Sequence, residues 1–284
     1  MKDELKWVVL LLLVSAIWGS TFVAIKDTLT SFGGFALLAI RFSIAALVLF
    51  IFIKFTRVKI TKDEVKFGSM LGVFLLAANG FQTIGLNYTS ANASAFITNL
   101  YVLLVPLLSA MLLHKMPKRK IWLSVVLAIV GMFFMLDAGD GFNVGDFFTL
   151  VCAFACALQI IYLAKYSPKC NPLSLAFVQI TFVAIASVVL MVPFNEVPSA
   201  FPLPAMLILI YLAILATVVA QVLQAEGQRR LEPSKVALIF ITEPLFAAAF
   251  GLFFLGEIFT MQKLLGAGMI LCALFISEWG AIDF

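Results

Sequence analysis

Ten apolar stretches alternate with short polar segments along the chain, and each is long enough to form several turns of helix. They cover residues 7–25, 32–53, 67–86, 91–113, 121–136, 147–163, 173–192, 203–223, 236–255 and 264–277. None of them shows the alternation of apolar and polar residues over about ten positions that marks a membrane β-strand. Because backbone polar groups in lipid must be paired within the structure, the pattern predicts an all-α bundle of ten transmembrane helices.

The composition is that of an integral membrane protein. Of the 284 residues, 63% are hydrophobic and 12% are charged, whereas a soluble domain has about 25% charged residues. Ten helices of about 20 residues leave only about 8 residues for each loop or tail, too few for a separate water-soluble catalytic domain. The chain also lacks the GxxxxGK[ST] phosphate-binding loop, which excludes an ATP-driven pump that works through this chain alone.

Side chains that could form an active site or a metal site are scarce. The chain has one histidine, His114, and we find neither a Ser/His/Asp set nor an HExxH zinc motif. The cysteines lie in or beside apolar stretches, without a familiar metal-ligand spacing, at Cys152, Cys156, Cys170 and Cys272. We therefore expect a protein that is not an enzyme and has no catalytic residues, metal or cofactor.

The basic residues predict the orientation of the bundle. With the N-terminus in the cytoplasm, every Lys and Arg falls in a cytoplasmic segment except Lys26 and Lys263, which face the other side, and Arg41, which lies within a stretch. The positive-inside rule then predicts that both termini are cytoplasmic and that the number of spans is even. The first stretch ends in polar residues rather than a small-residue cleavage site, so we expect it to be retained as the first helix.

A weak internal repeat divides the chain into two similar parts. A shift of 142 positions places Asn79 on Gln221 and Gln82 on Gln224, so that two polar residues with the same spacing coincide in corresponding stretches. We expect two halves of five helices each, with the domains 1–140 and 141–284. Because five is odd, the second half must be inverted relative to the first.

The loops agree with this inversion. The loop at 54–66 is strongly basic, whereas its counterpart at 193–204 has Glu196 and no basic residue. The two loops are therefore expected on opposite faces of the membrane. Inverted halves are typical of transporters that work by alternating access, which favours a transporter.

Several segments resemble motifs of the EamA family of the drug/metabolite transporter superfamily. They are WGSTFVAIK at 18–26, AFITNLYV at 95–102, ALIF at 237–240 followed by Glu243-Pro244, and LGE at 255–257. The resemblance covers the whole chain in two five-helix copies. It implies secondary transport, often export, of amino acids and other small metabolites or drugs across a bacterial inner membrane. The first copy departs from the pattern, because Leu113-His114-Lys115 stands where the second copy has LGE.

Arg41 lies near the middle of the second stretch, where a buried charge costs about 2.5 kcal/mol or more. One interpretation is an anchor for a substrate carboxylate, which a guanidinium can bind through two parallel hydrogen bonds. The alternative is a structural arginine that pairs with backbone carbonyls or Glu243, or that extends toward the membrane surface.

Glu243 lies about one third of the way into the ninth stretch and precedes Pro244, which removes a backbone donor and could leave carbonyl groups free nearby. A protonatable acid at this position could couple transport to proton movement. The alternative is an acid that fixes the packing of two helices.

Three further stretches each contain a pair of polar residues that are spaced three apart and so share a helix face. The pairs are Asn79/Gln82, Gln159/Tyr162 and Gln221/Gln224. They could line a central cavity or form hydrogen bonds that hold helices together. Trp18 and Tyr101 offer aromatic surfaces to a solute. The predicted substrate-binding residues are Trp18, Arg41, Asn79, Gln82, Asn99, Tyr101, Gln159, Tyr162, Gln221 and Gln224, with Glu243 as the predicted proton-coupling residue.

The predicted function is secondary active or facilitative transport, in the export direction, of amino acids or related small metabolites by alternating access. The alternative is proton-coupled efflux of cationic or aromatic drugs, in which Glu243 attracts the cation and Arg41 is structural. The expected partners are a small-molecule substrate, the lipid bilayer and, as a candidate coupling ion, protons, with no nucleic acid. We expect a multi-pass protein of the bacterial inner membrane. The sequence leaves the substrate, the coupling ion and the oligomeric state open, and a monomer would suffice.

Overall fold

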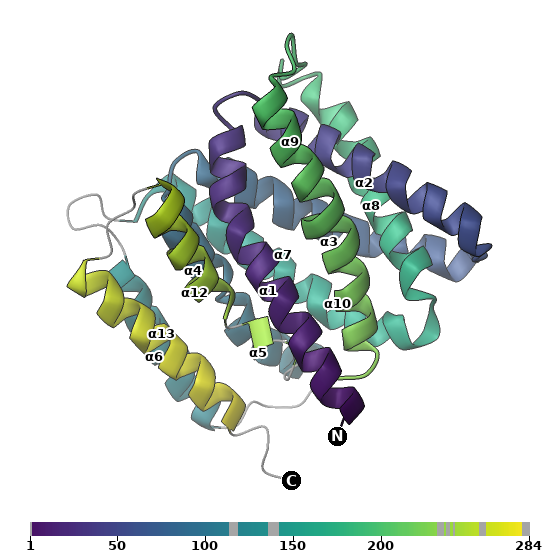
Figure 1. The fold of residues 1–284 in the computed structure, drawn as a ribbon. Coiled ribbons are helices and arrows are strands. Elements are labelled where there is room, and N and C mark those ends of the chain that lie inside the picture. The colour runs from purple at the N-terminus through teal and green to yellow at the C-terminus, as the bar shows by residue number, and fades with distance from the viewer. Residues whose placement is uncertain are drawn as a thin grey trace.

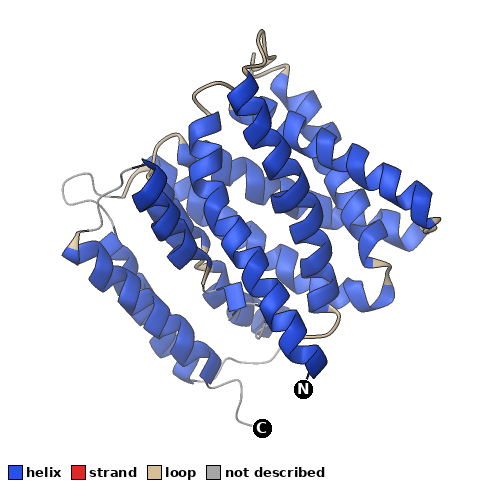
Figure 2. Ribbon diagram, in the orientation of Figure 1, coloured by secondary structure: helices blue, strands red, loops and turns tan. Residues whose placement is uncertain are grey.

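The described part of the chain is nearly all helical. The computed structural model describes residues 2–113, 119–135, 142–231, 236, 239–240, 242–255 and 260–279, and no β-strand occurs among them (Figure 2). His114 and Gly256-Glu257 of the loop-end motif, and the predicted boundary between residues 140 and 141, lie outside these ranges. The predicted all-α architecture is therefore confirmed for the described residues.

The helices of the first half follow the predicted stretches closely. They are α1 (Lys2–Thr28), α2 (Gly34–Thr56), α3 (Lys62–Leu86), α4 (Ala91–Thr98), α5 (Tyr101–Leu113) and α6 (Arg119–Met135). The second half contains α7 (Val144–Tyr166), the 3-10 turn η1 (Ser167–Lys169), α8 (Pro172–Met191), α9 (Leu203–Tyr211), the π-helical segment η2 (Leu212–Val219), α10 (Ala220–Gln228), α12 (Glu243–Phe250), the π-helical segment η3 (Gly251–Leu255) and α13 (Met261–Trp279).

Seven helical segments of the described chain are long and apolar enough to cross a membrane, and three shorter apolar helices accompany them. The shorter ones cover Trp122–Gly131, Glu243–Phe254 and Met261–Ala273. A count of ten spans thus stays a prediction. In Figure 1, α1 begins and α13 ends toward the same end of the bundle.

Two of the predicted stretches contain breaks that their hydropathy does not reveal. The fourth stretch divides into α4 and α5 at Asn99 and Leu100, where the Leu100 amide donates to the Ile97 carbonyl at 3.1 Å in a tighter turn. In the ninth stretch, α12 begins at Glu243, so Pro244 occupies the first turn of a helix. A proline in the first turn costs no hydrogen bond of the helix that it begins. The expectation that Pro244 leaves carbonyl groups free nearby stays a prediction.

Two glutamates tie the halves together at the starts of α2 and α8: Glu64 lies in the first turn of α3, and Glu196 lies in the loop between α8 and α9. Glu64 accepts a hydrogen bond from the Thr61 amide at 2.7 Å, which caps α3, and another from the Asn171 amide at 3.0 Å, directly before α8. Glu196 accepts hydrogen bonds from the amides of Phe35 at 2.5 Å and Ala36 at 3.2 Å, in the first turn of α2.

The chain segment that follows α2 therefore reaches the start of α8, and the segment that follows α8 reaches the start of α2. This reciprocal capping requires α2 and α8 to run antiparallel, and their long mutual contact is visible in Figure 1. Inverted halves require the same relation between the second helix of each half.

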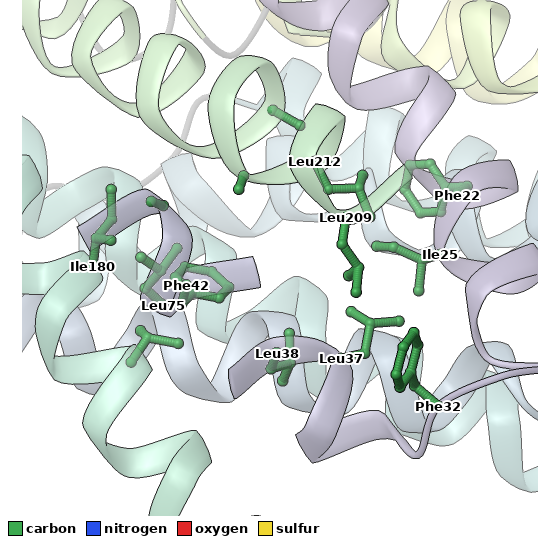
Figure 3. Packing of buried hydrophobic residues seen from close by; sticks show 14 of the residues in the cluster. Phe22, Ile25, Phe32, Leu37, Leu38, Phe42, Leu75, Ile180, Leu209 and Leu212 are labelled. Atoms are coloured by element: carbon green, nitrogen blue, oxygen red, sulfur yellow. The ribbon is translucent and has the colours of Figure 1, made fainter. Parts of the chain in front are cut away.

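A large apolar core of described residues joins α1, α2, α3, α8 and the region from α9 to η2. Figure 3 shows Phe22 and Ile25 of α1 packed near Leu37 of α2 and Leu209 of α9. Many large apolar side chains on the outer surface are exposed, as expected of a surface that contacts lipid.

Glycines allow close helix approach at two places. A Cβ atom at Gly68 or Gly72 of α3 would lie 2.7 Å from the Cβ atom of Val178 or Phe182 of α8, respectively. At the edge of the bundle, α6 and α13 lie side by side (Figure 1), and a Cβ atom at Gly131 would lie 2.8 Å from a backbone oxygen of α13. The small residues thus permit near-backbone contact inside the bundle.

Candidate functional site

A cavity of about 90 Å³ lies between helices of both halves. This is several times the roughly 10–15 Å³ that one water molecule needs on the same measure. Every predicted site residue lines it except Asn99 and Tyr162. The lining comprises Trp18, Thr21, Arg41, Phe42, Leu75, Ala78, Asn79, Gln82, Thr98, Tyr101, Cys152, Cys156, Gln159, Ile160, Ala216, Thr217, Gln221, Gln224, Phe240 and Glu243.

Arg41 is the buried cation of this cavity, with 5% of its surface exposed. Its Nε donates a hydrogen bond to Thr217 Oγ1 at 2.8 Å, and its guanidinium lies 5.2 Å from the ring centroid of Phe42. Within the described part of the chain, its Nη1 has no hydrogen-bond partner and no acidic side chain forms an ion pair with it. The predicted alternative of an Arg41–Glu243 pair is therefore not formed in this structure.

Glu243 is bound instead by a residue at the corresponding position of the other half. The Tyr101 hydroxyl donates to Glu243 Oε2 at 3.3 Å, and the two residues are separated by the 142 positions that relate the repeats. Tyr101 begins α5 and Glu243 begins α12, so each stands directly after the break in its stretch. The side chain of Asn99 is a second neighbour of this carboxyl group.

The π-helical segment η2 binds two cavity residues of the first half. In a π-helix the backbone hydrogen bonds span five residues, which makes a wider turn than that of an α-helix. The Trp18 indole Nε1 donates to the Ala216 carbonyl at 3.0 Å, and Thr217 Oγ1 donates to the Leu212 carbonyl, five residues earlier, at 2.8 Å. Thr217 is then left to accept the hydrogen bond from Arg41.

Amide side chains complete the polar lining. Asn79 Nδ2 donates to the Leu75 carbonyl of its own helix at 2.9 Å, and Gln179 Nε2 donates to Gln221 Oε1 at 3.4 Å. Gln159 Nε2 and Gln224 Oε1 are buried without a hydrogen-bond partner among the described residues. Polar atoms of this kind are costly to bury unsatisfied, and a polar solute in the cavity could satisfy them.

The two remaining predicted residues are not among those that line the cavity. Asn99 is buried at the break between α4 and α5, where its Nδ2 donates to the Ala95 carbonyl at 3.2 Å. Tyr162 belongs to an aromatic stack between α3 and α7, with its ring centroid 5.4 Å from Phe74 and 6.1 Å from Tyr166. The position of Tyr162 indicates helix packing rather than contact with a solute.

Some lining residues were not singled out from the sequence. Thr217 stands in the apolar run LAILATVV, where a lone hydroxyl is ordinarily satisfied by its own helix. Phe240 is one of 29 phenylalanines, and only the structure shows its ring 5.0 Å from that of Trp18. No group of three or more His, Cys, Asp or Glu side chains that could hold a metal ion occurs in the described ranges.

Comparisons with known proteins agree with the architecture. The chain is 36% identical to an uncharacterized transporter of Archaeoglobus fulgidus, over 94% of this chain and 83% of that protein. It is 27% identical to a protein of Salmonella typhimurium named "Probable amino-acid metabolite efflux pump", over 95% of this chain and 94% of that protein. A solved crystal structure shares the fold with a TM-score of 0.73 and 16% identity, over 96% of this chain and 97% of that one.

Both halves of the chain match one family of membrane proteins. The EamA-like transporter family matches residues 5–137 and again 143–279. The family and the named relatives are transporters, which confirms the predictions of a membrane transporter and of a protein that is not an enzyme. The resemblance read from the sequence motifs is thus confirmed, and the chain belongs to the EamA-like transporter family.

Proposed function

We propose that the protein exports amino acids or related small metabolites across the plasma membrane, as a secondary active or facilitative transporter. The observation that carries this proposal is the central cavity, which buried polar side chains from both halves line together. Relatives in Salmonella typhimurium and Escherichia coli are named as amino-acid metabolite efflux pumps, which supports the substrate class and the direction.

The lining suits a small molecule with both polar and apolar parts. Guanidinium, carboxyl and amide groups of Arg41, Glu243, Gln159 and others supply hydrogen bonds, while aromatic rings such as that of Trp18 supply apolar surface. Sites for small molecules combine a mostly apolar wall with a few polar groups in this way. The predicted substrate-binding residues that line the cavity remain our candidates for substrate contact.

Alternating access would follow from exchange between the conformations of two inverted halves. We assign residues 1–140 and 141–284 to these halves, with both termini in the cytoplasm and ten spans in a bacterial inner membrane. The contact between Tyr101 and Glu243 joins equivalent positions of the halves, so it lies where a change in one half must be matched by the other.

Glu243 is our candidate for coupling to protons. Movement that separates α5 from α12 would remove the Tyr101 hydroxyl from the Glu243 carboxylate and change its affinity for a proton. The same acid lines the cavity together with the rings of Trp18 and Phe240, which supports the second candidate function, proton-coupled efflux of cationic or aromatic drugs.

The test is uptake of a radiolabelled amino-acid panel into proteoliposomes, with and without an imposed pH gradient. Wild type, Glu243→Gln and a matched control, Glu226→Gln, are compared, since Glu226 pairs with Arg229 and Arg230 away from the cavity. The proposal predicts uptake that the gradient enhances in the wild type and the control but not in Glu243→Gln.

Equal, gradient-independent uptake in all three proteins would make this protein a facilitator and return Glu243 to a structural role. Absence of uptake for every amino acid, together with uptake of an aromatic cation such as ethidium, would replace the first proposal by drug efflux.

A further inference from the structure

The cavity contains a cationic group that the described protein does not neutralise. Arg41 is buried, yet its Nη1 lacks a hydrogen-bond partner among the described residues, and no ion pair of the described chain reaches it. A charge inside the membrane is costly unless a partner or a polar cavity compensates it. The guanidinium lines the cavity, so a solute is a suitable partner for the free donor.

The guanidinium of Arg41 has a defined orientation because Thr217 binds its Nε atom. Thr217 Oγ1 accepts from Arg41 Nε at 2.8 Å, and the same hydroxyl donates its proton to the Leu212 carbonyl at 2.8 Å. This donation spans five residues, as the wide turn of η2 allows, and leaves the hydroxyl only as an acceptor for Arg41. Rotation of the guanidinium about its long axis would break the bond to Thr217.

We propose that Thr217 is a positioning residue that orients Arg41 so that the guanidinium binds the carboxylate of the transported solute. This inference rests on the proposed transport function and narrows it to substrates with a carboxylate group. A fixed guanidinium recognises a carboxylate through charge-assisted hydrogen bonds, which are stronger than those to a neutral amide. The neighbouring amide atoms of Gln159 and Gln224 offer hydrogen bonds to the rest of the solute.

The position of the acidic residue in the described lining agrees with this assignment. Glu243 also lines the cavity but forms no ion pair with Arg41, and Tyr101 donates to it instead. The guanidinium and the carboxyl group thus line one cavity without pairing with each other. A solute that carries a carboxylate and an ammonium group could meet Arg41 with the first and Glu243 with the second.

The test compares acids with their amides as ligands of the purified full-length protein. Binding of each amino acid and of its carboxamide, which lacks the carboxylate, is measured by ligand-induced thermal stabilisation and by competition for uptake into proteoliposomes. For the best-bound amino acid, the wild type should bind the acid about 10- to 100-fold more tightly than the amide, as expected for a charge-assisted bond.

The variants separate positioning from general stability. Arg41→Gln should abolish the preference for acid over amide, and Thr217→Val should reduce it about tenfold, while Thr217→Ser should restore it because serine keeps the hydroxyl. Thr149→Val is the matched control, since Thr149 also donates to a carbonyl of its own helix, that of Gly145, at 2.8 Å but lies outside the cavity lining. The acid-to-amide ratio is informative because a purely structural loss weakens both ligands equally.

Each outcome bears on the two proposals differently. Equal affinity for acids and amides in the wild type, or an unchanged ratio in Arg41→Gln, overturns this inference but leaves transport of small metabolites in place. If Arg41→Gln loses the preference for the acid over the amide but Thr217→Val keeps it unchanged, the role of Thr217 is overturned. Failure of the wild type to bind any acid or amide overturns both this inference and the proposed amino-acid substrate.

Discussion

Removal of the Glu196 carboxylate should loosen the first turn of α2. The N-cap residue of α2 is Gly33, which has no side chain to accept a hydrogen bond from the helix, and Glu196 accepts from Phe35 and Ala36 in its place. Hydrogen bonds to a charged group contribute about 1.5–3 kcal/mol, and the half-buried position of Glu196 favours the lower part of that range. We expect Glu196→Ala to destabilise the protein by about 2 kcal/mol, or about 4–8 °C in Tm for a protein of this size.

Gly33→Ala should produce much of the same loss without altering the acid. A Cβ atom at Gly33 would lie 2.5 Å from the Glu196 side-chain carbons, so the carboxylate would have to move away from the helix. Both substitutions break the same contact. The free energy of unfolding of the double variant should therefore lie within about 0.5 kcal/mol of that of Glu196→Ala alone. Gly80→Ala is the control, since a Cβ atom there meets nothing within 4 Å.

The assay is thermal unfolding of detergent-purified protein, followed by tryptophan fluorescence and checked by size-exclusion chromatography. If Glu196→Ala costs as much in the Gly33→Ala background as in the wild type, the two residues do not share a contact. The capping of α2 by the loop of the other half would then be refuted.

Three further substitutions test other contacts. Gly131→Ala should lower Tm and reduce the free energy of unfolding by about 1–3 kcal/mol, because the new methyl group meets the backbone of α13 at 2.8 Å. An unchanged Tm would contradict the close packing of α6 on α13. Trp18→Phe should cost about 1 kcal/mol, measured by thermal unfolding, because the Ala216 carbonyl loses its indole donor. Tyr101→Phe should alter the dependence of uptake on an imposed pH gradient, because Glu243 loses a hydrogen-bond donor, and a profile identical to the wild type would argue against coupling through this pair.

The sequence predicted the helical architecture and the residues around the cavity because polar side chains are rare within apolar stretches. A residue such as Gln82 or Gln221 must be satisfied inside the bundle or face a polar space, and the lining includes both of them. Tyr162 shows the limit of this reasoning. It shares a helix face with Gln159, yet its ring packs against Phe74 and Tyr166, because an aromatic side chain can be buried against other rings.

The features that the sequence did not predict depend on the local backbone path. Thr217 acquires its role only because η2 is π-helical, and nothing in its apolar surroundings marks a widened turn. The hydropathy of the sequence likewise does not indicate the break at Asn99 or the start of α12 at Glu243. The shift of 142 positions does align Tyr101 with Glu243, but equivalent positions of two repeats need not be in contact.

Alternating access requires that the cavity open in turn to each side of the membrane. The most direct measurement labels Gln82→Cys, a cavity residue, in a protein whose four native cysteines are replaced, with a membrane-impermeant thiol reagent added to either side of oriented proteoliposomes. We expect labelling from both sides, and protection against labelling from each side by a bound amino acid. Labelling from one side only, unchanged by any amino acid, would contradict alternating access through this cavity.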